Sequence, residues 1–299
     1  MTRRLRINAP AKINWTLEVL RIRPDGYHEL RTILQTIDLC DTVTLSESDR
    51  IEIILSGDTG HLADQPPEEN LAYRAAEALR RHAEMESGVR IEIEKRIPVA
   101  AGLGGGSSDA AAVIRGCNVL WSAGLDIPQM RRVAADVGSD PPFFIVGGTA
   151  LARGRGEHVE PLPDALAPPI LLATPPQDHR GEKTARMFDA LAPNDFSEGY
   201  VTIGLADAVE SSHQIDDAML NNVFERVTAK MQPETENAMD ALRALNYSPH
   251  VAGAGPSFFV LLPDETQRRA LELRIKDLGF EPRMVHALPR ADALRIEES

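Results

Sequence analysis

The stretch PVAAGLGGGSSDAA, residues 98–111, places four glycines within the five positions from Gly102 to Gly106. Because glycine has no Cβ atom, such a run either lets backbone N–H groups approach an anion closely or forms a tight turn. A strand pattern precedes the glycines, and a helix is predicted to begin near Ser107 or Ser108. Its apolar residues recur at helical spacing: Ala110, Val113, Ile114, Cys117, Leu120 and Trp121. The layout favours phosphate binding, with a plain strand-to-helix turn as the alternative.

The loop differs from the two common phosphate-binding loops. A Walker A loop needs a lysine followed by Ser or Thr after its glycines, and no lysine follows here. The dinucleotide fingerprint of oxidoreductases would place a glycine where Ser107 stands. The hydroxyls of Ser107 and Ser108 can cap the helix, donate to a phosphate or ligate Mg²⁺.

Composition limits the classes of partner. The chain has 299 residues, enough for two domains, and a formal net charge of −13, which argues against binding to nucleic acid or to an anionic membrane. No apolar run approaches the ~20 residues of a membrane span, and no apolar segment follows the basic residues of MTRRLRINAP. With two isolated cysteines, Cys40 and Cys117, the chain is expected to be cytoplasmic with reduced thiols.

The first half predicts a sheet with inserted helices. Ala11, Ile13, Trp15, Leu17 and Val19 alternate with Lys12, Asn14 and Thr16, which predicts a strand over 11–19. A turn is predicted at 23–26. Further extended segments are predicted over 28–39, 41–46, 50–55 and 89–97, and helices over 70–81 and 128–137.

Four prolines between Pro161 and Pro169 predict a boundary between domains 1–160 and 161–299. In the second half, strands are predicted over 170–173, 251–255, 257–262 and 283–287, and helices over 182–191, 216–230, 233–245 and 266–278. The order strand–helix–strand–strand–helix–strand predicts a ferredoxin-like α/β sandwich.

Three polar features are candidates for chemistry, each with a plainer alternative. Lys95 shares a row with apolar strand residues, so its ammonium either points into a cleft or marks where the strand leaves the core. Asp140, before two prolines, is either a held general base or a cap. Lys12 and Asn14 either face one cavity or lie on a solvated sheet face. Because the eight histidines are scattered and no His-Glu-x-x-His or Cys-x-x-Cys occurs, no protein metal site is predicted.

Together these stretches resemble the GHMP kinase superfamily, which includes galactokinase, homoserine kinase, mevalonate kinase and phosphomevalonate kinase. The resemblance lies in the phosphate loop at 98–111, PAKIN at 10–14 and the glycines at 253–255. It implies an α+β, two-domain fold, with an N-terminal lobe like domain 2 of ribosomal protein S5 and a C-terminal ferredoxin-like lobe. It also implies a small-molecule kinase that uses ATP and Mg²⁺.

Residues 9–45, with PAKIN and RPDGYHEL, narrow the resemblance. They are similar to the members that phosphorylate the 2-hydroxyl of a cytidine-diphosphate-linked methylerythritol in the non-mevalonate isoprenoid pathway. In those members the matching residues Lys12 and Asp140 form the catalytic pair. Homoserine and mevalonate kinases have no use for a cytosine site, and a non-catalytic regulator would be expected to lack Lys12 or Asp140. The resemblance implies a monomer or weak homodimer.

The resemblance also implies binding roles. Tyr27 would stack on the cytosine, His28 would bond its edge, and Phe188 with Thr184 would form the other side. Asn14 would reach the sugar-alcohol hydroxyls. The predicted nucleotide site comprises Asn70, Leu71 and Lys95 around adenine, and Pro98, Gly102, Leu103, Gly104, Gly105, Gly106, Ser107 and Ser108 around the triphosphate. Gly253 and Gly255 would line the active site.

Three residues depart from the superfamily pattern: Pro256 after the last glycine of the third motif, Pro141 after the predicted base, and Asn222 where aspartate is common. Proline removes a backbone donor. The resemblance therefore predicts activity but leaves the local loop geometry open.

Overall fold

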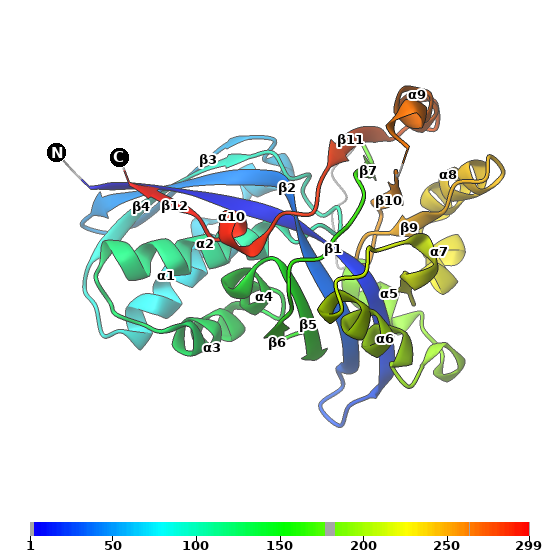
Figure 1. Cartoon of the computed structure of the whole chain (residues 1–299). Helices are drawn as coiled ribbons and strands as arrows, with labels where there is room; N and C mark the ends of the chain where they lie inside the picture. Colours follow the sequence, from blue (N-terminus) through cyan, green and yellow to red (C-terminus); the bar gives the residue numbers. More distant parts are fainter. Residues whose placement is uncertain (1–2, 177–182, 263, 299) are drawn as a thin grey trace.

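The computed structural model describes residues 3–176, 183–262 and 264–298 and contains two β-sheets flanked by helices (Figure 1). Among these residues, eight strands form the larger sheet, in which β12, β1, β2, β4 and β3 are neighbours in that order. Its strands are β1 (Arg4–Ile22), β2 (His28–Ser48), β3 (Ile51–Gly57), β4 (Gly88–Lys95), β5 (Thr149–Gly154), β6 (His158–Pro161), β8 (Asn221–Asn222) and β12 (Ile296–Glu298).

A long antiparallel hairpin of β1 and β2 runs through both halves of the molecule (Figure 1). The predicted turn at 23–26 joins the two strands, and Gly26 adopts φ +82° there, a left-handed conformation that favours glycine. The segments predicted over 28–39 and 41–46 form the single strand β2. Both faces of β1 are buried from Ala9 to Val19, so its polar residues face the protein interior instead of water.

Helices α1 (Leu71–His82), α2 (Gly105–Leu120), α3 (Ile127–Val137) and α4 (Pro141–Val146) lie on one side of this sheet (Figure 1). The predictions for α1 and α3 agree within one residue, because each has an apolar stripe and an N-terminal cap. Helix α2 begins at Gly105, two or three residues before the predicted start at Ser107 or Ser108. Gly104, at φ +72°, ends the loop, so Ser107 and Ser108 lie inside the helix and do not cap it.

The second sheet has the strand order β11 (Glu281–Val285), β7 (Ile170–Thr174), β10 (Phe258–Leu261) and β9 (Pro249–Val251). Helix α8 (Pro233–Arg243) precedes β9, and α9 (Arg268–Asp277) precedes β11. Their apolar faces share one core with this sheet. The arrangement confirms the predicted ferredoxin-like sandwich.

In the described part of the chain between β7 and α8 lie three α-helices: α5 (Lys183–Asp189), α6 (Tyr200–Glu210) and α7 (Glu225–Met231). The prediction of one helix over 216–230 is wrong, because a 3₁₀ turn and β8 occupy its first half. Helix α10 (Arg290–Ala293) leads to β12. Both β8 and β12, from the second half of the chain, pair with β1, and the boundary at 160/161 stays a prediction. No helix in the described ranges is long and apolar enough to cross a bilayer.

His250 on β9 links the second sheet to the 3₁₀ turn at 217–219 and to the first residue of α7. Its Nε2 lies 3.4 Å from a carboxylate oxygen of Asp217, and its Nδ1 lies 3.5 Å from Glu225. Burial alone lowers the pKa of His250, but the two carboxylates outweigh burial and raise this pKa to about 9. The protonated imidazole therefore stabilises the fold.

We expect His250→Gln to remove a pH-dependent part of the stability. The unfolded histidine has a pKa of about 6.5. Because the folded pKa is higher, the contribution is complete below about pH 6.5 and is lost as pH rises toward about 9. Urea unfolding at pH 6, 7.5 and 9 should show a wild-type advantage that shrinks with pH. The exposed His213 provides the control His213→Gln. A constant advantage at all three pH values would contradict this.

Candidate active site

A cavity of about 770 Å³ lies where the β1–β2 hairpin meets the second half of the chain. Most predicted site residues line it: Lys12, Asn14, Tyr27, His28, Leu71, Lys95, Pro98, Gly102, Leu103, Gly104, Gly105, Gly106, Ser107, Asp140, Thr184, Phe188 and Gly253. Asn70, Ser108 and Gly255 do not line it. The cavity thus brings together segments that are far apart in sequence: Lys12 and Gly253 are separated by about 240 residues.

The glycine loop is pressed between three other segments. The backbone N–H of Lys12 donates to the carbonyl of Leu103 at 2.9 Å, which joins β1 to the loop. A Cβ atom on Gly102 would lie 2.6 Å from the carbonyl oxygen of Ala252. A Cβ atom on Gly104 would lie 2.9 Å from the Phe144 ring and 3.1 Å from the Lys12 side chain. These glycines are therefore required by close packing as well as by positive φ.

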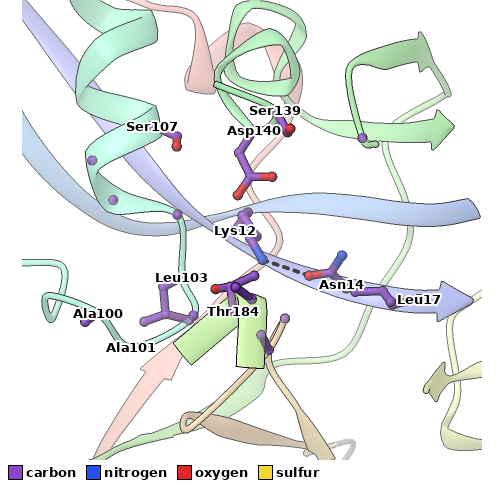
Figure 2. A pocket seen from close by; sticks show the side chains of 18 of the residues that line it. Lys12, Asn14, Leu17, Ala100, Ala101, Leu103, Ser107, Ser139, Asp140 and Thr184 are labelled. Atoms are coloured by element: carbon purple, nitrogen blue, oxygen red, sulfur yellow. Dashed lines mark hydrogen bonds between the residues drawn. The ribbon is translucent and has the colours of Figure 1, made fainter. Parts of the chain in front are cut away.

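Lys12 and Asn14 face the cavity and not solvent. The Lys12 side chain, in a residue that is 7% exposed, donates from Nζ to Asn14 Oδ1 at 2.9 Å (Figure 2). Asn14 Nδ2 donates in turn to Thr32 Oγ1 at 2.7 Å, and Thr32 donates to the Thr16 carbonyl at 2.5 Å. This chain of hydrogen bonds fixes the position of the ammonium.

Asp140 precedes the first residue of α4, and its carboxylate points toward Lys12 (Figure 2). In the described chain its side chain makes no capping hydrogen bond, so the alternative of a simple helix cap is not what the structure shows. Burial lowers the pKa of Lys12, and the negative charge of Asp140 partly offsets this. Pro141 occupies the first turn of α4, where a missing N–H is tolerated. An ammonium and a carboxylate therefore share one cavity with the glycine loop.

Lys95 differs from both sequence interpretations. Although it lines the cavity, its ammonium is buried in ion pairs with Asp41 and Asp109. The side chain is 2% exposed, so the ammonium neither marks an exit from the core nor points freely into the cleft. The sequence did not indicate Asp41 as the ion-pair partner of Lys95, because the two residues are 54 positions apart.

Asn70, another predicted nucleotide-site residue, caps α1 by accepting from the Ala72 N–H at 2.9 Å.

Two amide side chains, those of Asn222 and Gln232, donate hydrogen bonds to the backbone of the third glycine motif at 253–255 and of Val251. Asn222 Nδ2 donates to the carbonyls of Val251 and Gly253, both at 2.8 Å. An ionised aspartate could not donate these bonds, so both depend on the amide of Asn222. Gln232 Nε2 donates to the Ala254 carbonyl at 2.7 Å. The Gly255–Pro256 peptide is cis.

An aromatic group forms the other end of the cavity. Tyr27 is 53% exposed, and the guanidinium carbon of Arg155 lies 4.7 Å from its ring centroid. The His28 ring stacks on Phe188 of α5 with centroids 5.0 Å apart and an interplanar angle of 23°. Burial lowers the pKa of His28. The sequence analysis did not identify Arg155, because an arginine between Gly154 and Gly156 matches no binding motif.

We expect Gly253→Ala to impair ATP-dependent turnover, the activity that the resemblance predicts. Gly253 has φ +60°, and a Cβ atom there would lie 2.6 Å from Lys12 Nζ and 2.7 Å from the Gly102 carbonyl oxygen. Displacing the ammonium should lower kcat/KM about 100-fold.

The matched control for this variant is Gly279→Ala, because Gly279 also has positive φ, +84°, but open space around it. It should share the backbone strain and keep turnover. Steady-state rates of both variants, with thermal melts, separate the two effects. Equal loss in both variants would contradict a specific role for the contact with Lys12.

Comparisons with known proteins place the fold and the site in a family. The model of the GHMP kinases N terminal domain matches residues 70–148, and that of the GHMP kinases C terminal domain matches residues 204–279. The 4-diphosphocytidyl-2-C-methyl-D-erythritol kinase of Dehalococcoides mccartyi strain BAV1 is 37% identical over 289 residues, 96% of this chain and 100% of the relative. The kinase of the same name from Bacillus cereus strain B4264 is 40% identical over 283 residues, 93% of this chain and 94% of the relative.

Solved structures agree with these matches. A crystal structure of a 4-(cytidine 5'-diphospho)-2C-methyl-D-erythritol kinase superposes with a TM-score of 0.75 at 32% identity, covering 95% of this chain and 100% of the other. The predicted small-molecule kinase class and the GHMP-kinase-like fold are confirmed. The chain belongs to the GHMP kinases and, among them, to the family of 4-diphosphocytidyl-2-C-methyl-D-erythritol kinases.

Proposed function

We propose that this protein transfers the γ-phosphoryl group of ATP to the 2-hydroxyl of 4-diphosphocytidyl-2-C-methyl-D-erythritol, in the methylerythritol phosphate route to isoprenoid precursors. The observation that carries the proposal is the arrangement of Lys12 and Asp140, which face one cavity together with the glycine loop. The named relatives, at 37% and 40% identity over nearly the full chain, support the choice of substrate.

In the proposed mechanism, Asp140 orients the acceptor hydroxyl and takes its proton. The buried Lys12 ammonium lies where negative charge develops on the transferred group, and Asn14 holds this ammonium in place. Because phosphoryl transfer passes through a loose transition state, placement and charge stabilisation contribute more than base strength. Burial of Lys12 strengthens its interaction with the phosphoryl oxygens.

The backbone amides from Gly104 to Ser107 and the N-terminal end of α2 would hold the triphosphate. In the described ranges no group of three or more His, Cys, Asp or Glu could hold a metal ion. The hydroxyl of Ser107 nevertheless offers an oxygen ligand in the same cavity, which suits Mg²⁺ carried by the nucleotide. Bound there, Mg²⁺ would neutralise phosphate charge.

The aromatic end of the cavity would bind the cytidine moiety. Tyr27 offers an exposed ring face, and the pair formed by His28 and Phe188 offers an apolar wall with a ring nitrogen for the base edge. Thr184 also lines the cavity, where it would help to hold the base, and Asn14 would reach the sugar-alcohol hydroxyls. A monomer or weak homodimer in the cytoplasm, with no nucleic-acid partner, stays a prediction.

We expect Asp140→Asn to lower kcat by about 10²–10⁴-fold, because the carboxylate that takes the proton is lost. ATP affinity should stay within about twofold, since the loop amides are unchanged. Steady-state kinetics and calorimetric ATP titration measure the two quantities. Asp136→Asn, on the exposed side of α3, is the matched control and should behave as wild type. Near-normal turnover of the Asp140 variant would remove this residue from the mechanism.

Substrate choice can be tested with three alcohols. ADP release should be rapid with 4-diphosphocytidyl-2-C-methyl-D-erythritol and at least about 100-fold slower with homoserine or mevalonate, which cannot occupy the aromatic end. A coupled assay at equal concentrations gives kcat/KM for each. Faster release with homoserine or mevalonate would overturn the proposal.

A further inference from the structure

A buried ion cluster lies beneath the glycine loop, and the mechanism above does not use it. The cluster consists of Lys95 on β4, Asp41 on β2 and Asp109 on α2. Lys95 Nζ pairs with Asp41 and, at 2.7 Å, with Asp109. None of the three side chains is more than 5% exposed. Charges this deep in the protein are costly unless they pair, so the geometry of the cluster is tightly held.

The cluster holds the chain where it enters the glycine loop. Asp41 Oδ1 accepts from the backbone N–H groups of Arg96 at 2.5 Å and Ile97 at 2.8 Å. These residues directly follow β4 and precede Pro98, the first residue of the loop motif. The carboxylate of Asp41 therefore binds both the Lys95 ammonium and the backbone at the start of the loop.

The same cluster holds the chain where it leaves the loop. Asp109 lies in the second turn of α2, and a Cβ atom on Gly105, the first residue of this helix, would be only 3.4 Å from Lys95 Nζ. One ammonium thus connects the end of β4 to the start of α2. The loop between these two points, residues 98–104, lines the cavity.

Two polar atoms beside the cluster are buried without a partner. In the described chain, Asp109 Oδ1 and the neighbouring Ser108 Oγ make no hydrogen bond. The ion pair with Lys95 is therefore the interaction that holds the Asp109 carboxylate in place.

We propose that Asp109 is a positioning residue for nucleotide binding, which acts through Lys95 and Asp41 to fix both ends of the phosphate loop. This role rests on the proposed function, in which the loop binds the phosphates of ATP. It differs from a general contribution to folding, because it acts on the donor geometry at one end of the substrate cavity.

Calorimetric titration of the full chain with ATP tests the role. We expect Asp109→Ala to weaken ATP binding about tenfold, while KM for the alcohol substrate stays within about twofold. Asp109→Asn should recover part of the affinity, since its carbonyl oxygen still accepts from Lys95. The matched stability control is Asp126→Ala, which removes the cap at the Gln129 N–H of α3 and leaves the loop untouched.

The outcomes separate this role from the proposed function. Failure of the wild type to bind ATP would overturn the proposed function and this role with it. ATP binding by the wild type with equal affinity in Asp109→Ala would overturn only the positioning role. Two further results would also overturn it: an Asn variant no better than the Ala variant, or the same loss of ATP affinity in Asp126→Ala.

Discussion

The close approach of three backbone segments around Lys12 is the constraint on which the rest of the site depends. The Lys12 N–H is bonded to Leu103 at 2.9 Å, and any Cβ atom at Gly104 or Gly253 would collide with the Lys12 side chain or its neighbours. Segments from the first and second halves of the chain therefore both contact this lysine. The glycine loop and Asp140 line the same cavity. The proposed phosphate binding and proton acceptance thus depend on a single packing arrangement.

The positive charge of this acidic chain is concentrated at a few positions in the cavity. A chain with a net charge of −13 repels a nucleotide triphosphate at long range, so positive potential has to be supplied locally. Lys12 supplies it within the cavity, together with the loop amides and the N-terminal end of α2. Lys95 supplies no positive potential to the cavity, because Asp41 and Asp109 already neutralise its ammonium. Its effect on the nucleotide is structural, through the ends of the loop.

Patterns that are local in sequence predicted much of this fold. Helices α1 and α3 and the ferredoxin-like order were predicted because stripes, caps and turns lie within a few residues of one another. Helix α6 was missed, since YVTIGLADAV is apolar around most of its circumference and shows no stripe. The membership of Lys12, Asp140 and the glycine loop in one site came from family resemblance. Partners such as Asp41 for Lys95, or Asn222 for the Gly253 turn, are long-range pairings that no local pattern reports.

The most direct test of this account is a crystal structure with a non-hydrolysable ATP analogue and 4-diphosphocytidyl-2-C-methyl-D-erythritol bound together. We expect the γ-phosphoryl group to lie between the loop amides and Lys12 Nζ. We expect the 2-hydroxyl within hydrogen-bond reach of the Asp140 carboxylate, and the cytosine beside Tyr27. A triphosphate bound away from the glycine loop, or a 2-hydroxyl remote from Asp140, would contradict it.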